Sequence, residues 1–154
     1  MTVVAVACIA AWLGIMAFFS FGVAPLAFAM MERTAAGQVV AAVLPRYYIT
    51  GLGLCAVALV VYAAQAAGGR GGRLRPLAGV VLCAAMMGML AWAATVLTPQ
   101  AEAARRTRDD IAFARAHRAS VTLNGVTMLA AVAVLALEGV RRAPKAARPP
   151  GRPR

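Results

Sequence analysis

Four polar residues in the last third of the chain are spaced so that they share one face of a helix. They are His117, Ser120, Asn124 and Thr127. Side chains three or four positions apart lie on the same side of an α-helix. If lipid surrounds this helix, the polar row must face a partner. The row then predicts hydrogen bonds between helices, which is our preferred interpretation, or else a site for a ligand or ion.

Sulfur-containing side chains are the other groups with binding chemistry, because thiolates and thioethers suit Cu(I). The candidates are Cys8, Cys55, Cys83, Met86, Met87 and Met89. In the topology derived below, Cys55 should lie far in depth from Cys8 and Cys83, so the three thiols are not expected to share one metal. His117 is the only histidine, which excludes a haem held by two histidines of one chain. We therefore predict no metal site and no cofactor.

The sequence lacks the patterns of known catalytic sites. It contains no GxSxG, P-loop or HExxH motif. Asp109 and Asp110 are adjacent, so on a helix their side chains point about 100° apart, and nearby arginines can neutralise them. Nothing resembles an acid–base pair, and we predict no catalytic residue and no enzymatic activity.

The composition indicates what surrounds these residues. The chain is 62% hydrophobic and only 14% charged, whereas a soluble domain is about 45–50% apolar and about 25% charged. Lipid solvates such an apolar surface directly. The net charge is +11, but the arginines flank or follow the apolar runs. We therefore expect a bilayer with anionic headgroups as the partner, and no nucleic acid.

The apolar runs have the length that a membrane crossing requires, which is about 20 residues. We predict an all-α fold, an integral membrane four-helix bundle in residues 1–142, followed by a disordered basic tail rich in proline and arginine in residues 143–154. The predicted spans are residues 3–25, 49–67, 77–98 and 119–140.

The segments between the spans are more polar. Residues 32–46 read as a short amphipathic helix at the membrane interface between the first two spans, with Tyr47 and Tyr48 at headgroup depth. Residues 100–118 read as an exposed helix. Three ion pairs between residues four apart should support it: Glu102 with Arg106, Arg105 with Asp109, and Arg106 with Asp110.

Two further features concern packing and orientation. Small residues four apart, Ala10 with Gly14 and Ala84 with Gly88, predict a close approach of helix backbones. Lysine and arginine are slightly more numerous on the side that holds both termini. Both termini are therefore expected to be cytoplasmic.

A set of residues spread along the chain resembles the pattern of the transmembrane-protein-205-like family, which in bacteria comprises membrane domains of unknown function. The matching residues include Trp12, Gly14, Pro25, Gly37, Pro45, Tyr48, Pro99 and Arg118. The stretch from Phe113 to Asn124 is the most specific part. The resemblance implies a four-span helical membrane protein, and no catalytic residue carries over because no mechanism is established for the family.

The animal member of this family has been linked to resistance to platinum drugs and to vesicle traffic. This chain lacks the long loop that the animal protein inserts before its last helix. The frequent use of alanine, arginine and glycine is typical of a bacterium with a GC-rich genome, so we expect a multi-pass protein of the bacterial cytoplasmic (inner) membrane.

Three function hypotheses follow from these observations. The first is a non-enzymatic membrane protein that acts as a transport component, a metal- or drug-tolerance factor, or a scaffold. The second is a membrane redox protein that binds haem or copper, with His117 contributed by several copies of the chain. The third is an assembly factor for another membrane complex. A homo-oligomer or another membrane protein is the expected protein partner.

Overall fold

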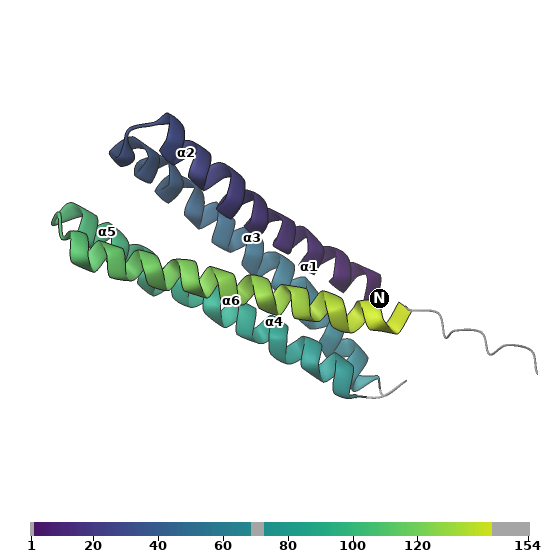
Figure 1. Cartoon of the computed structure of the whole chain (residues 1–154). Coiled ribbons are helices and arrows are strands. Elements are labelled where there is room, and N and C mark those ends of the chain that lie inside the picture. Colours follow the sequence, from purple (N-terminus) through teal and green to yellow (C-terminus); the bar gives the residue numbers. More distant parts are fainter. Residues whose placement is uncertain (1, 69–72, 143–154) are drawn as a thin grey trace, which may run out of the picture.

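The structure, a computed structural model, describes residues 2–68 and 73–142, and all secondary structure in these residues is helical (Figure 1). Two of the segments, η1 and η2, are π-helical. In chain order the segments are α1 (Thr2–Ala17), η1 (Phe18–Val23), α2 (Ala24–Met30), α3 (Arg33–Ala67), α4 (Leu74–Trp92), η2 (Ala93–Leu97), α5 (Thr98–Arg106) and α6 (Asp110–Arg142). The predicted disordered tail, residues 143–154, lies outside the described residues.

The segments join into four continuous rods, each long and apolar enough to cross a membrane. The rods are Thr2–Met30, Arg33–Ala67, Leu74–Arg106 and Asp110–Gly139. Large apolar side chains such as Phe18, Phe21 and Leu129 are at least 70% exposed, which suits a surface in contact with lipid rather than water. The prediction of an all-α protein with four membrane-spanning helices is confirmed at this level.

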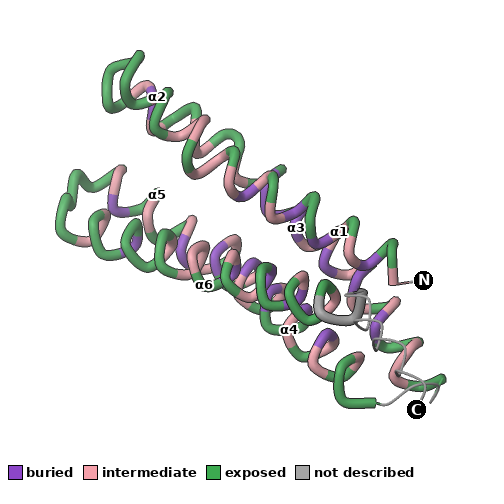
Figure 2. Tube along the Cα trace, turned by 45° about the vertical axis from the view of Figure 1, so that its right-hand side comes forward, coloured by how far each residue is buried: buried purple, intermediate pink, exposed green. Residues whose placement is uncertain are grey.

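The rods form a ring in which α1 and α4 each pack against both α3 and α6. The backbones of α1 and α4 do not meet, and neither do those of α3 and α6. The first and second rods form one hairpin, and the third and fourth rods form the other. Figures 1 and 2 show these two hairpins diverging toward the end that carries α2 and α5, where α2 approaches neither α5 nor α6. Buried residues therefore gather in the other part of the bundle, and α2 and η1 contain none.

The predicted interfacial helix between the first two spans is not a separate element. Residues 33–46 are the first part of α3, which runs for 35 residues from Arg33 to Ala67 with Pro45 inside it. A proline inside a helix removes a single backbone hydrogen bond, and α2 packs beside this part of α3. At 1.5 Å per residue, α3 is about 52 Å long, so it extends beyond the roughly 30 Å of membrane hydrocarbon.

The predicted exposed helix over residues 100–118 is interrupted. α5 ends at Arg106 and α6 begins at Asp110. Between them Arg108 takes a left-handed conformation with φ of 56°, and the Asp109 carboxylate caps α6 by accepting a hydrogen bond from the backbone N–H of Ala112 at 2.9 Å. Glu102 and Arg106 pair at 3.0 Å as predicted.

The other two predicted ion pairs, Arg105 with Asp109 and Arg106 with Asp110, do not form between these described residues. The reason is the same interruption. Both aspartates belong to the start of α6 or to the turn before it, so they no longer lie one helical turn from the arginines.

Two aromatic rings pack directly on glycines and bring neighbouring rods close together. A Cβ atom added to Gly51 of α3 would lie 2.5 Å from the Trp12 ring of α1, and one added to Gly79 of α4 would lie 2.7 Å from the Tyr62 ring of α3. Trp12 is 0% exposed and Tyr62 is 1% exposed. These two contacts fix the distances from α3 to its two neighbours.

The two hairpins are built alike. The buried positions Ala5, Ile9, Trp12 and Met16 of α1 recur 74 residues later as Gly79, Cys83, Met86 and Leu90 of α4. Buried Gly51, Cys55 and Ala58 of α3 likewise recur 76 residues later as Thr127, Ala131 and Val134 of α6. Because both hairpins begin at the same end of the bundle, the chain has the arrangement of two parallel repeats.

The π-helical segments also correspond. In η1 the N–H of Ala24 donates to the carbonyl of Phe19, and in η2 the N–H of Thr98 donates to the carbonyl of Ala93, five residues back in both cases. The next residue is Pro25 or Pro99, which has no N–H to donate. Each proline is thus the second residue of the short outer helix, α2 or α5, that follows the widened turn.

The small-residue pairs do not pack inside the bundle as predicted. Ala10 and Gly14 are exposed, and so are Ala84 and Gly88. A Cβ atom at either glycine would meet nothing within 4 Å. The close approaches are made instead at Gly51 and Gly79, because the aromatic rings opposite them require the space.

Candidate functional site

Asn124 of α6 is the centre of a polar cluster that joins three segments. The hydroxyl of Tyr47 in α3 donates a hydrogen bond to its Oδ1 at 2.6 Å. Its Nδ2 in turn donates to the hydroxyl oxygen of Ser20 in η1 at 3.0 Å. The bond from Tyr47 connects the diagonal rods α3 and α6, whose backbones do not meet.

Aromatic neighbours hold Tyr47 in place. Its ring centre lies 4.8 Å from that of Trp12, 5.0 Å from Phe19 and 5.5 Å from Tyr48. Tyr47 and Tyr48 are 7% and 8% exposed, so both rings point into the bundle. The prediction that both tyrosines lie at headgroup depth did not include this inward orientation. The orientation depends on the register of α3 against α1.

A small cavity lies beside this cluster. The cavity has a volume of about 20 Å³, which is room for about one water. Its lining comes from α3, α4, η2 and α6: Tyr48, Met89, Leu90, Ala93, Ser120, Leu123, Asn124 and Thr127. No charged side chain lines it, so the cavity is suited to a neutral group.

Two hydroxyls at the cavity are already bonded within α6. Ser120 donates to the carbonyl of Ala116 at 3.0 Å, and Thr127 donates to the carbonyl of Leu123 at 2.8 Å. Thr127 is 1% exposed, and its Oγ1 lies 3.8 Å from Sδ of Met89 in α4. Both hydroxyl oxygens keep the capacity to accept a bond from a guest.

The predicted polar row is therefore divided by the structure. Ser120, Asn124 and Thr127 come together at the cavity. His117 does not, because it is exposed and its ring stacks on Phe113 at 6.0 Å. His117 lies where the hairpins diverge, and no rod covers that face of α6.

The residues that carry the family-like pattern have different positions. Trp12 lies in the core and Tyr48 lines the cavity. Pro25 and Pro99 follow the two π-helical segments. The remaining four are Gly14, Pro45 and Arg118, which are exposed, and Gly37, which is half-buried.

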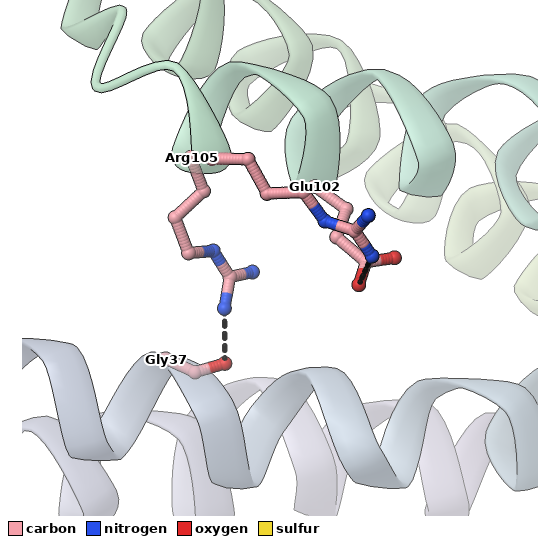
Figure 3. A network of polar contacts seen from close by, with 4 residues as sticks. Gly37, Glu102 and Arg105 are labelled. Atoms are coloured by element: carbon pink, nitrogen blue, oxygen red, sulfur yellow. Dashed lines mark hydrogen bonds and ion pairs between the residues drawn. The ribbon is translucent and has the colours of Figure 1, made fainter.

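Arg105 makes a second polar link between the hairpins, toward their diverging end. Its Nη1 donates to the carbonyl of Gly37 in α3 at 3.2 Å. Figure 3 shows the side chain reaching from α5 across to α3, while Glu102 points elsewhere. The guanidinium also lies over the Phe113 ring at 5.8 Å from its centre, which adds a cation–π attraction.

Changing Arg105 to glutamine should loosen this outer end. The loss of a charged hydrogen bond and of the cation–π contact is expected to cost about 1–2 kcal/mol of local stability. Hydrogen exchange of the α5 amides should then be roughly tenfold faster. Arg106→Gln is the matched control, because Arg106 is highly exposed and bonds only within its own helix at Glu102. Equal exchange rates in the two variants would contradict the link to Gly37.

The cysteines are closer in depth than the sequence suggested. Thr2 bonds to Gln65, so these residues mark one end of the bundle. Counting from that end, Cys8 lies about 9 Å and Cys55 about 15 Å along the helices. Cys8 and Cys83 both contribute to the electrostatic environment of Cys55. The predicted wide separation of Cys55 was wrong, because it assumed a shorter second span.

All three cysteines are free thiols. Within residues 2–68 and 73–142, no group of three or more histidine, cysteine, aspartate and glutamate side chains is placed to hold a metal ion. Proximity of the thiols therefore does not produce a metal site of that kind in the described part of the chain.

Sequence reasoning missed the role of Ser20, which is one hydroxyl inside a long apolar run. A polar residue in such a run is itself a signal for an inward position. It also missed the link from Arg105 to Gly37, since the carbonyl of Gly37 belongs to the backbone and leaves no mark in the sequence.

The chain matches the model of one protein family, described as a domain of unknown function (DUF4149), over residues 7–110. This region covers most of the first rod, the second and third rods, and the start of α6. It ends before the stretch from Phe113 to Asn124. No curated protein and no solved structure matches the chain.

Proposed function

The chain belongs to the family of domains of unknown function DUF4149, and on that premise we propose that it is a non-enzymatic membrane protein, a small transport component that binds a neutral polar solute beside Asn124. The observation that carries this proposal is the cavity lined by Ser120, Asn124 and Thr127, which lies between three of the four apolar rods. Polar groups that face inward in a membrane bundle are the usual elements of a solute path.

Three features of the surroundings support a transport role. Asn124 of the second hairpin bonds to both rods of the first hairpin, so a change at the cavity acts on both hairpins. The chain has the form of two parallel repeats, which is common in transporters. Two π-helical segments flank the cavity region, and such segments are often found at functional sites.

The solute class follows from the lining. The cavity offers amide and hydroxyl groups and no charge, which favours a small neutral molecule over an ion. A guest much larger than water requires the rods to separate, because the space is only about 20 Å³. The hairpins already diverge beyond the cavity (Figure 2).

Location and finer family membership are part of the proposal. We place the protein in the bacterial cytoplasmic membrane with both termini cytoplasmic, on the distribution of arginine and lysine. We also keep the narrower assignment to transmembrane-protein-205-like proteins, which rests on the residue pattern and suggests a test of growth in the presence of platinum drugs. The protein partners named from the sequence stay predictions.

The transport proposal is tested with purified protein in lipid vesicles. Stopped-flow light scattering follows the uptake of water, urea and glycerol by vesicles with and without the protein. Ser120→Val adds methyl groups to the cavity wall without removing a bond between helices, and it should return uptake to the protein-free rate. Thr95→Val is the control, because Thr95 is exposed and donates only to Ala91 of its own helix at 2.7 Å.

If vesicles with the unaltered protein take up every solute at the protein-free rate, the transport role is wrong. If both variants retain uptake equally, the cavity beside Asn124 is not the site.

A further inference from the structure

A second set of polar side chains lies inside the bundle at the end opposite α2 and α5. Tyr62 of α3 is 1% exposed, and its hydroxyl is fully buried. Gln65 lies one turn further along the same helix, and its Nε2 is also fully buried. Neither atom has a hydrogen-bond partner in the described part of the structure.

The surroundings of these two atoms come from all four rods. The Thr2 hydroxyl of α1 donates to Oε1 of Gln65 at 3.4 Å, so the amide oxygen faces α1. The Tyr62 ring rests on Gly79 of α4. Glu138 of α6 is near enough to interact electrostatically with Tyr62. The hydroxyl and amide donors therefore lie next to a carboxylate-bearing helix.

Buried donors without acceptors are rare in folded proteins, and each one requires an explanation such as an ordered water or ion. Here two donors occur three residues apart on one helix face, where side chains are neighbours. A single guest can satisfy both. It must accept bonds from a hydroxyl and an amide, and it lies beside a carboxylate, which repels an anion and accepts bonds from a donor.

We propose that Tyr62 and Gln65 bind a buried water molecule that accepts a hydrogen bond from each of them and donates one to the Glu138 carboxylate. Three bonds are the typical number for a buried water. The site lies about 21 Å from Asn124 along α6, so it is separate from the cavity discussed above. The inference does not depend on the transport role.

With this water in place, hydration extends at least one helical turn below the end of α3 that carries Gln65. The two ends of the bundle then differ. At one end Arg105 bonds to the carbonyl of Gly37, and at the other end the polar side chains are hydrated. The apolar layer between them holds the buried residues Cys55, Cys83 and Ala131.

The test uses the full-length protein in lipid bilayers, with tyrosine rings labelled with ¹³C. Water-edited solid-state NMR measures how quickly magnetisation passes from water to each ring, and Tyr62→Phe assigns the signal by its absence. Rapid transfer to Tyr62 is expected, and Gln65→Met should slow it. Tyr47 is the internal control, because its hydroxyl bonds to Asn124 far from Gln65, so Gln65→Met should leave transfer to Tyr47 unchanged.

Stability gives a second, independent readout. If the Tyr62 hydroxyl is bonded to water, Tyr62→Phe should raise the unfolding equilibrium constant about fivefold. If that hydroxyl has no partner, its removal is neutral or stabilising. No rapid transfer to Tyr62 in the unaltered protein would overturn the proposal. A Tyr62→Phe variant that is as stable as the parent would overturn it too.

Discussion

Replacing Gly51 by alanine is expected to destabilise the bundle by about 1–3 kcal/mol, the usual cost of overpacking a filled core. The new Cβ atom would lie 2.5, 2.6 and 2.9 Å from three atoms of the Trp12 ring. That ring cannot move aside easily, because Trp12 is 0% exposed and its other neighbour is Tyr47 at 4.8 Å. The measurement is the free energy of unfolding in mixed micelles, followed by tryptophan fluorescence.

Gly53→Ala provides the matched control on the same helix. Gly53 is exposed, and a Cβ atom there meets nothing within 4 Å. Alanine is favoured over glycine in a helix by about 0.8–1 kcal/mol, so this variant should be neutral or more stable. The contact between α1 and α3 would be placed wrongly if Gly51→Ala behaved like Gly53→Ala.

Replacing Asn124 by leucine should cost about 1–3 kcal/mol, because it leaves the hydroxyls of buried Tyr47 and half-buried Ser20 without their partner. Bonds between helices within membranes average less, about 0.6 kcal/mol each. Two bonds are lost here, and they connect three segments. The loss should be measured as a free energy of unfolding in the same micelles.

A double-mutant cycle separates this bond from general packing. Tyr47→Phe removes the hydroxyl alone, and together with Asn124→Leu it should cost less than the two changes taken separately. Ser120→Ala is the control, since its hydroxyl bonds only to Ala116 of its own helix. Strictly additive free energies would show that Tyr47 and Asn124 do not interact.

The four rods were predictable because each apolar run meets the length needed to cross lipid, and this requirement needs no knowledge of packing. The polar row was predictable for a similar reason, since it depends on helical periodicity alone. Ser120, Asn124 and Thr127 did come together at one cavity. His117 did not, because the divergence of the hairpins is a tertiary property.

The extent of α3 was not predictable in the same way. Pro45, Arg46 and Glu32 looked like a boundary, yet the helix continues through Pro45. A proline costs one hydrogen bond, and packing against α2 offsets that loss. The wrong depth for Cys55 followed directly from this shortened span.

The break between α5 and α6 was signalled in the sequence. Asp109 precedes an apolar residue at Ile111 and is a favoured type for a helix cap. The two predicted ion pairs to Asp109 and Asp110 require a continuous helix through this point, so they are incompatible with the cap. Tyr47 is different: whether a tyrosine at a membrane edge points to lipid headgroups or inward depends on the register between rods, which no local pattern encodes.

The two π turns give the molecule a way to rotate its ends. A π turn holds one residue more than an α turn, so converting η2 to ordinary α-helix would swivel α5 by about 100° about its own axis relative to α4. Arg105 would then leave Gly37 and face another direction. The same holds for α2 beyond η1. The orientation of each outer helix, α2 or α5, thus depends on the π turn that precedes it, η1 or η2.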